Sequence, residues 1–407
     1  VIIGRDTRIS GQMLEASLVA GLLSIGADVV RIGVVTTPAV AYLTRKFGAD
    51  AGVMISASHN PVEDNGIKFF GGDGFKLSDE TELAIERLMD AEKDELPRPV
   101  GGEMGSVRDD LDAKWQYAQY LQSITPARFD GRKIVLDCAH GAAYELAPAI
   151  FRALGAEVVA IGAEPDGLNI NAGVGSTHTG AIREATVRHG AFLGLSFDGD
   201  ADRLIAIDER GEEVDGDYIL CICGDAMKRE GRLANNTIVT TVMANLGFFQ
   251  ACKGLGLSTA KTAVGDRYVM EEMRRGGFNL GGEQSGHVIF LDYNTTGDGI
   301  LTALQLVSTV IASGKPLSEL KTMMRKFPQV LVNVRVADKS GLADNERIAA
   351  AIREAEAALG ESGRVLVRPS GTEALVRVMA EGPDEAEIAA HAERIAEAVR
   401  AELGDAT

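Results

Sequence analysis

The clearest fold signal in the chain is KIVLDCAHGAAYELAPAIFRALGAEVVAIG, residues 133–162. It begins with a β-branched run, passes through a loop of small residues into an amphipathic stretch that ends near glycine, and closes with a second strand-like run. That order, over a length of about thirty residues, is typical of a βαβ unit. The segment therefore predicts two parallel strands joined by a helix.

Two more segments have the same shape. One is VIIGRDTRISG…LVAGLLSIGADVVRIG at residues 1–33, and the other is TIVTTVMANLGFFQACKGLGLSTAKTAVG at residues 237–265. Three such units in a chain of 407 residues predict three related α/β domains in tandem.

The C-terminal part follows a different pattern. QVLVNVRVAD alternates as a strand does, residues 345–360 and 384–403 have helical period, and the strand-like runs GRVLVRPSG and EALVRVMAE lie between them. This order predicts a smaller α+β domain with an antiparallel sheet. We therefore expect an α/β protein of four domains around a central cleft, at residues 1–104, 112–212, 213–327 and 328–407.

Composition argues against two classes of partner. The formal net charge of −18 argues against binding to nucleic acid or to an anionic membrane surface. No apolar stretch reaches the roughly 18 to 20 uncharged residues that cross a bilayer.

The cysteines and the first residues bear on location. Cys221 and Cys223 have no second cysteine pair that would complete a zinc site, so we expect reduced, buried thiols in a cytoplasmic protein. The chain starts at Val1 on an apolar run without a basic region, so we expect no signal peptide. A start without methionine indicates that residues upstream are missing.

A serine is displayed in the stretch GVMISASHNPVEDNGIKFF, residues 52–70. Ser58 follows the strand-like run 53–55 and lies in a turn of small residues that Asn60 and Pro61 bend sharply. A turn serine is a poor nucleophile without an activator, so a polar loop residue explains the stretch equally well.

Three aspartates alternate in LGLSFDGDADRLIAID. In a locally extended loop Asp198, Asp200 and Asp202 point to one side, and such a cluster repels itself unless a hard cation accepts its oxygens. An EF-hand loop is a rival interpretation, but Arg203 occupies the required glycine and the flanks are strands. A solvated acidic turn is the bland alternative. The compact triplet between two buried strands favours a metal site, and Mg²⁺ is the ion that such a site usually binds.

Two further loops carry polar groups. In NLGGEQSGHVIF, Glu283, Ser285 and His287 alternate, and a carboxylate beside a hydroxyl can hold sugar hydroxyls. In VRPSGTEALVR, a guanidinium, two hydroxyls and free amides suit a phosphate. Taken alone, each loop is explained as well by an ordinary turn.

Together the motifs SASHNP, DGDADR, GGEQSGH and RPSGTE, in this order, resemble the α-D-phosphohexomutase superfamily over nearly the whole chain. Gln284, DGFKL at residues 73–77 and GSTH at residues 175–178 resemble its glucosamine branch. The resemblance implies an isomerase that interconverts glucosamine 6-phosphate and glucosamine 1-phosphate through a 1,6-bisphosphate, feeding UDP-N-acetylglucosamine and cell-wall precursor synthesis. A small sugar phosphate is the implied partner, and a homodimer is left open.

The resemblance also implies roles for individual residues. Ser58 is the implied phosphoserine, whose phosphate completes a Mg²⁺ site with Asp198, Asp200 and Asp202. His59, Lys68 and His287 are the candidates for moving the hydroxyl proton. The implied substrate-binding residues are Arg203, Glu283, Gln284, Ser285, Arg368, Ser370, Gly371 and Thr372, the last four holding the phosphate that is not reacting.

Two departures from the family pattern stand out. An FGTDGxRG-like motif, whose arginine belongs to the family's active site, would precede Val1. Ala374 stands where the family usually has proline after RPSGTE, which we expect to loosen the turn without removing a phosphate ligand.

Other functions remain as alternatives. An aspartyl phosphatase would have Thr or Val where Asp202 stands and would leave Ser58 without a role, and a serine hydrolase lacks its Gly-x-Ser-x-Gly elbow. A phosphomannomutase or phosphoglucomutase of the same superfamily differs only in the sugar. A sugar-phosphate sensor on the same scaffold is the alternative that is not an enzyme.

Overall fold

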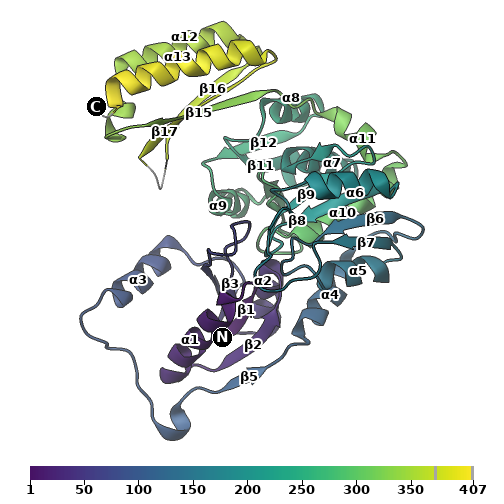
Figure 1. Ribbon diagram of the computed structural model, residues 1–407, viewed down its shortest axis with the longest axis vertical. Coiled ribbons are helices and arrows are strands. Elements are labelled where there is room, and N and C mark those ends of the chain that lie inside the picture. The colour runs from purple at the N-terminus through teal and green to yellow at the C-terminus, as the bar shows by residue number, and fades with distance from the viewer. Residues whose placement is uncertain (371–373, 405–407) are drawn as a thin grey trace. The chain divides into compact units, whose positions relative to one another are not determined.

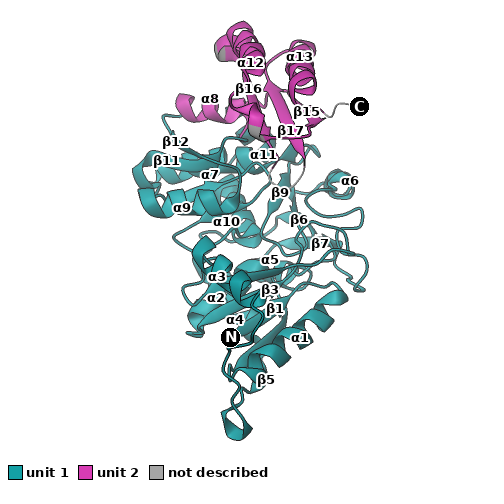
Figure 2. Cartoon of the chain, turned by 90° about the vertical axis from the view of Figure 1, so that its left-hand side faces the viewer, with its two compact units in different colours: residues 1–243, 255–323 teal, residues 244–254, 324–407 magenta. Residues whose placement is uncertain are grey.

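The computed structural model describes residues 1–370 and 374–404. It forms two compact units, one made of Val1–Met243 with Leu255–Met323 and the other of Ala244–Gly254 with Met324–Thr407 (Figure 2). Three sheets belong to the first unit and one sheet to the second. Figure 1 labels most of the helices and strands, which are numbered in chain order.

The first sheet has the strand order β4-β3-β1-β2-β5. Strand β1 pairs in parallel with β2 and β3, and β4 runs antiparallel to β3. Its strands are β1 (Ile2–Arg5), β2 (Val29–Val34), β3 (Ala51–Ile55), β4 (Ile67–Gly71) and β5 (Val107–Asp109). The helices of this segment are α1 (Ser10–Ser24), α2 (Thr37–Lys46) and α3 (Asp79–Met89).

The second sheet has the order β10-β9-β8-β6-β7. Strand β6 is parallel to β7 and β8, and β9 is antiparallel to β8. Its strands are β6 (Lys133–Asp137), β7 (Glu157–Ile161), β8 (Leu193–Phe197), β9 (Leu204–Ile207) and β10 (Glu213–Val214). The helices here are α4 (Ala113–Ile124), α5 (Leu146–Ala153), α6 (Gly180–Arg188) and α7 (Gly216–Arg229).

The third sheet has the order β12-β11-β13-β14, with β14 antiparallel to β13. Its strands are β11 (Thr237–Thr241), β12 (Ser258–Thr262), β13 (Leu280–Gly282) and β14 (Val288–Phe290). The helices of the first unit that follow are α9 (Asp266–Gly276), α10 (Gly299–Ser313) and α11 (Leu317–Leu320).

These three sheets repeat one topology. In each, the first four strands are arranged 4-3-1-2, and the fourth strand is antiparallel to the third. The three predicted segments each give two parallel strands with a helix between them in sequence, so the prediction of related α/β domains is confirmed. The repeat also gives each sheet one loop between its third and fourth strands, at the carboxyl end of the third. Ligand sites in α/β sheets favour this end.

The second unit holds a three-stranded antiparallel sheet of order β15-β17-β16, as predicted for an α+β domain. Valines on one face of the sheet pack against two helices and form the core. The elements of this unit are α8 (Leu246–Gly254), β15 (Gln329–Arg335), α12 (Glu346–Leu359), β16 (Arg364–Pro369), β17 (Leu375–Glu381) and α13 (Glu385–Leu403).

Helix α8 shows why the units do not follow the sequence order. Asn245 and the backbone N–H of Leu246, at its start, both donate hydrogen bonds to the buried carboxylate of Glu381 on β17. The helix of the third βαβ segment is therefore tied to the C-terminal sheet. The boundaries of the four expected domains stay predictions.

Within the described residues, no single helix is long and apolar enough to cross a membrane, although one pair bent by 90°, Gly299–Ser313 with Leu317–Met323, has the length and composition when taken together. All four cysteines are buried.

Candidate active site

The three loops between third and fourth strands meet at one cavity of about 420 Å³ in the first unit. Each predicted motif of that unit lies on one of these loops: SASHNP between β3 and β4, DGDADR between β8 and β9, and EQSGH between β13 and β14. Ser58, Lys68, Arg203, Asp266, Glu283 and His287 are among the residues that line the cavity. The repeated topology therefore brings together motifs that are far apart in the sequence.

Ser58 is held in an unusual backbone conformation. Its φ of 54° lies in the left-handed region, which a serine rarely adopts. Its N–H donates to Ser56 Oγ at 2.9 Å, and its own hydroxyl donates to Asp198 Oδ2 at 2.5 Å. His59 Nδ1 lies 3.4 Å from Ser58 Oγ. The turn thus directs the hydroxyl toward the aspartates of the second loop, and such strain is often found at functional residues.

A buried arginine fixes the backbone of this turn. The Arg8 side chain is fully buried, and its guanidinium donates to the carbonyls of Ser58 at 3.1 Å and Asn60 at 2.9 Å, and also to that of Pro61. Asn171, from the second sheet's segment, donates to the first two of these carbonyls, at 2.9 and 3.0 Å. Two side chains from different segments therefore hold the same turn.

Asp6 completes this support. Its Oδ2 accepts hydrogen bonds from Arg8 Nε at 2.9 Å and from Ser56 Oγ at 2.7 Å. Asp6, Arg8 and Asn171 were not predicted from the sequence. Asp6 and Arg8 could have been found from the sequence, because GRDTR places charged residues directly after a buried parallel strand. Charged residues are rarely buried there without a functional role.

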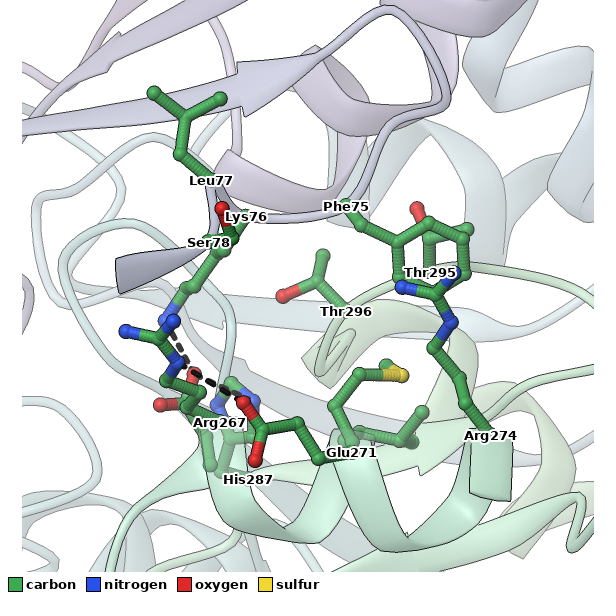
Figure 3. A pocket seen from close by; sticks show the side chains of 13 residues that line it. Phe75, Lys76, Leu77, Ser78, Arg267, Glu271, Arg274, His287, Thr295 and Thr296 are labelled. Atoms are coloured by element: carbon green, nitrogen blue, oxygen red, sulfur yellow. Dashed lines mark hydrogen bonds and ion pairs between the residues drawn. The ribbon is translucent and has the colours of Figure 1, made fainter. Parts of the chain in front are cut away.

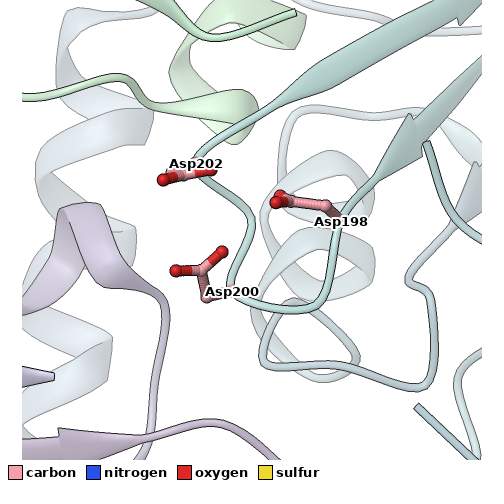
Figure 4. A group of neighbouring side chains, drawn as sticks. All are labelled: Asp198, Asp200 and Asp202. Atoms are coloured by element: carbon pink, nitrogen blue, oxygen red, sulfur yellow. The ribbon is translucent and has the colours of Figure 1, made fainter. Parts of the chain in front are cut away.

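The three aspartates of the second loop form one cluster. Asp198, Asp200 and Asp202 are all buried, and one carboxylate oxygen from each lies within 4.8 Å of the others (Figure 4). Asp200 Oδ1 and Asp202 Oδ1 are buried and have no hydrogen-bond partner among the described residues. Buried carboxylate oxygens are normally paired, so this donor set suits a hard divalent cation.

Charges around the cluster are incompletely balanced by protein groups. Burial and the charges of Asp202 and Asp200 hold the pKa of Asp198 well above its ordinary value. Asp200 Oδ2 accepts from Lys68 Nζ and from Thr37 Oγ1, both at 2.5 Å. Although burial alone would lower the pKa of Lys68, Asp200 and Asp202 raise it, so Lys68 stays protonated. One further cation would relieve the repulsion that raises the pKa of Asp198.

The pKa values of His59 and Arg203 are shifted in opposite directions. Burial and the charge of Arg203 lower the pKa of His59. Burial would lower the pKa of Arg203 too, but Asp198 and Asp202 raise it. The cavity therefore holds a permanent guanidinium beside the aspartates.

The predicted residues of the third loop lie in different environments. Glu283 and His287 line the cavity, whereas Ser285 is exposed and Gln284 is not among the lining residues. Gln284 Nε2 lies 3.5 Å from Asp215 Oδ2. His287 is only 3% exposed and lies between two carboxylates, with Nδ1 3.6 Å from Asp202 and Nε2 3.5 Å from Asp266.

The fourth motif lies in the second unit, on the hairpin of β16 and β17. Arg368 faces Arg377 across this hairpin, and burial with that second charge lowers the pKa of Arg368. Ser370 is buried, and its carbonyl accepts from Lys339 Nζ at 2.8 Å. The predicted residues Gly371 and Thr372 lie outside the described residues. Paired guanidinium groups of this kind suit an anion.

Comparison with known families covers all four parts of the chain. Four models of phosphoglucomutase/phosphomannomutase domains match: α/β/α domain I at residues 1–96, domain II at 116–211, domain III at 215–327 and the C-terminal domain at 331–398. Among solved structures, a phosphoglucomutase/phosphomannomutase family protein from Burkholderia thailandensis has a TM-score of 0.81 at 24% identity, covering 98% of this chain and 88% of that one.

Another similar structure is N-acetylphosphoglucosamine mutase from Aspergillus fumigatus, in complex with GlcNAc-6P and magnesium. Its TM-score is 0.68 at 20% identity, with 90% of this chain and 92% of that chain covered. These structural likenesses concern the fold.

Sequence relatives are much more similar. The phosphoglucosamine mutase of Brevibacillus brevis is 62% identical over 403 residues, which are 99% of this chain and 90% of that protein. The phosphoglucosamine mutase of Geobacillus kaustophilus is 61% identical over 405 residues, with the same coverage. With four matching domains and such identity over nearly its whole length, the chain belongs to the α-D-phosphohexomutase family of isomerases, in its group of phosphoglucosamine mutases.

Proposed function

We propose that this chain interconverts glucosamine 6-phosphate and glucosamine 1-phosphate, with Ser58 carrying the phosphoryl group between the two positions. The observation that carries the proposal is the 2.5 Å contact between Ser58 Oγ and Asp198 in a buried cluster of three aspartates. A turn serine with an ordinary structural role has no need of such a cluster. Relatives that are about 60% identical bear the name phosphoglucosamine mutase, which supports the choice of sugar.

The reaction consists of two transfers in opposite directions. A free hydroxyl oxygen of the sugar phosphate attacks phosphorus on phosphorylated Ser58, the bond from phosphorus to Ser58 Oγ breaks, and glucosamine 1,6-bisphosphate forms. The sugar turns end for end, and Ser58 Oγ then attacks its other phosphate. In each transfer the proton of the attacking hydroxyl passes, through an acid–base group, to the oxygen that leaves. The serine is regenerated in its phosphorylated form.

We assign Asp198, Asp200 and Asp202 to a Mg²⁺ ion, together with a phosphate oxygen on Ser58. The oxygens of Asp200 and Asp202 that lack a hydrogen-bond partner among the described residues support this assignment, as does the magnesium in the Aspergillus complex. A bound Mg²⁺ would neutralise charge on the phosphoryl group during transfer. Lys68 would add a fixed positive charge on the cavity side of Asp200.

The proton carrier is one of three residues. His59 Nδ1 lies close to Ser58 Oγ, at 3.4 Å. Lys68 is held protonated by its carboxylate partners, which suits an acid better than a base. His287 is only 3% exposed, and its Nε2 accepts a hydrogen bond from the Gly297 N–H at 3.2 Å, so it is less accessible to a sugar hydroxyl than His59.

The remaining predicted residues would hold the sugar and its second phosphate. Arg203 and Glu283 line the cavity and can reach a sugar ring there. Ser285 and Gln284 stay predictions on the same loop. Arg368, Ser370, Gly371 and Thr372 would bind the phosphate that is not reacting. A homodimer and a cytoplasmic location also stay predictions, which light scattering and cell fractionation test.

A coupled assay with the 6-phosphates of glucosamine, N-acetylglucosamine, glucose and mannose tests the proposal. We expect turnover of glucosamine 6-phosphate to exceed the other three clearly. Equal turnover of glucose and mannose phosphates would move the assignment to a phosphoglucomutase or phosphomannomutase. Binding of the sugar phosphate without turnover would identify a sensor.

A further inference from the structure

The cavity contains a carboxylate that the predicted site does not include. Apart from the metal-cluster residue Asp202, the acidic residues that line it are Asp266 and Glu283. Asp266 is the first residue of α9 and directly follows Gly265, whose N–H donates to Glu283 Oε1 at 3.2 Å. The two carboxylates therefore lie on adjoining parts of the cavity wall. Gln284, the residue expected to distinguish sugars, is not part of that wall.

Asp266 lies where two cavities adjoin. Lys76, Asp266 and His287 line both the 420 Å³ cavity and a smaller one of about 120 Å³. In the smaller cavity, residues 75–78 lie on one side and α9 lies on the other (Figure 3). Lys76 belongs to DGFKL, one of the stretches typical of the glucosamine branch. The pair that it forms with Asp266 therefore joins the first and third sheets' segments at the cavity.

The geometry leaves part of this carboxylate available. Lys76 Nζ and His287 Nε2 both contact Oδ2, the latter at 3.5 Å, so Oδ1 is not used by either. The Asp266 side chain is 26% exposed, compared with 3% for that of His287. Burial would raise the pKa of Asp266, but the charges of His287 and Lys76 lower it, so the group is ionised at neutral pH.

An ionised carboxylate distinguishes an amino sugar from a plain sugar. In its protonated form, the C2 substituent of glucosamine is an ammonium group. This group donates hydrogen bonds to acceptors and is stabilised by a neighbouring negative charge. A C2 hydroxyl can pair with hydrogen-bond acceptors and donors alike, and a neighbouring negative charge stabilises it less than it stabilises an ammonium group. Sites that pair a specific polar group discriminate strongly, whereas shape alone discriminates weakly.

We propose that Asp266 is a specificity-determining residue whose Oδ1 accepts a hydrogen bond from the C2 ammonium group of the substrate. This inference deepens the proposed function and rests on it. Lys76 balances the carboxylate when no sugar is bound.

The test compares glucosamine 6-phosphate with glucose 6-phosphate as substrates of the full chain and its variants. For Asp266→Asn we expect kcat/KM for glucosamine 6-phosphate to fall about 30-fold, mainly through KM, because the amide keeps the shape and loses the charge. Activity with glucose 6-phosphate should change less than about threefold. Glu271→Gln is the matched control: it removes another carboxylate of α9, one that lines only the smaller cavity. It should leave both substrates unchanged.

Two further variants keep the test decisive if Asp266→Asn lowers the melting temperature. Asp266→Glu retains the charge and should keep the preference for glucosamine within about fivefold. Lys76→Met leaves the carboxylate without its competing cation and should preserve or increase the preference.

Several outcomes would overturn the inference. Equal losses with both substrates in Asp266→Asn would make Asp266 a positioning residue for His287, and no loss would remove it from recognition. A preference lowered about tenfold in Lys76→Met would also contradict it. A wild-type chain that turns over neither substrate would instead refute the proposed function, so the two failures are distinguishable.

Discussion

The loops β8–β9 and β13–β14 occupy the same place in two repeats of one topology, yet they present their polar residues differently. In the first, all three alternating aspartates converge on one cluster. In the second, Glu283 and His287 line the cavity while Gln284 and Ser285 do not. Equivalent positions in the fold therefore do not guarantee equivalent use of an alternating sequence.

Backbone hydrogen bonds define the turn of the third loop. Glu283 N–H donates to the carbonyl of His287 at 3.0 Å, and Gly286 N–H donates to that of Glu283 at 3.0 Å. Glu283 and His287 are thus the paired ends of a tight hairpin, which Gly286 closes with a φ of 90°. Residues at the tip of this hairpin therefore do not alternate between two sides as the residues of an extended strand do. The β8–β9 loop contains a similar turn, in which the Ala201 N–H donates to the carbonyl of Asp198 at 3.1 Å and Ala201 has a φ of 56°. The difference therefore lies in the side chains, since three carboxylates share one cluster there, whereas Ser285 at the tip of the third loop is exposed.

The largest effect is expected at Ser58, where the first loop meets the metal loop. Ser58→Ala should reduce turnover by several orders of magnitude, because the phosphoryl carrier is lost. Its melting temperature should stay close to that of the wild type, since a turn hydroxyl adds little packing. A coupled assay and thermal unfolding measure the two quantities. Activity within about tenfold of the wild type would contradict the assignment.

Asp200→Asn is expected to rank next. It removes one charge from the cluster and should lower kcat by at least about 100-fold, with a higher Mg²⁺ concentration needed for half-maximal activity. Metal titration of the variant and the wild type measures this shift. Full activity of the wild-type chain in excess EDTA would be incompatible with the metal assignment.

Arg8→Lys tests whether the clamp on the first loop matters for chemistry. Lysine keeps the charge but cannot donate to three carbonyls in the fixed fork of a guanidinium. We expect kcat to fall about 10- to 100-fold with KM nearly unchanged, because a displacement of about 1 Å at the donor is costly. A variant whose KM rises while kcat holds would place Arg8 in substrate binding instead.

Arg368→Ala probes the hairpin of the second unit. A charge-assisted phosphate contact is worth about 1.5–3 kcal/mol, so KM should rise at least as much as kcat falls. Steady-state kinetics with glucosamine 6-phosphate separate the two constants. Lost turnover at a normal KM would assign Arg368 to the reacting phosphate.

The smallest effect is expected for Gln284→Met. From the sequence this residue is expected to contact the sugar, but its amide faces Asp215. We therefore expect the preference for glucosamine over glucose phosphate to change less than about threefold, well below the effect of Asp266→Asn. If the preference for glucosamine phosphate fell about tenfold, recognition of the C2 group would instead be assigned to the tip of the third loop.

Much of the fold followed from sequence because each βαβ segment contains its own signal. Strand, small-residue loop, helix and strand all lie within 133–162, and local pattern was sufficient there. The grouping of α8 with the C-terminal sheet was not accessible, because it depends on Asn245 meeting Glu381 across 136 positions of sequence. Local periodicity carries no information about such a pair.

The candidate site divides in the same way. The three aspartates are recognisable in sequence because all of them lie within the six residues DGDADR. The place of Arg8 after a buried strand was a usable signal, but the carbonyl groups that Arg8 and Asn171 bind have no sequence signature. Asp266 was missed because its place on the cavity wall depends on how α9 begins beside the third loop.

Intact-mass measurement of the chain is the sharpest test of whether Ser58 carries the phosphoryl group. We expect a fraction of the protein to be heavier by one phosphoryl group, with the modification on Ser58. This additional mass should be lost when glucosamine 6-phosphate is added, as glucosamine 1,6-bisphosphate dissociates. Ser58→Ala should lack the heavier species. A wild-type chain that catalyses the interconversion while never carrying a phosphate on Ser58 would contradict the phosphoserine mechanism.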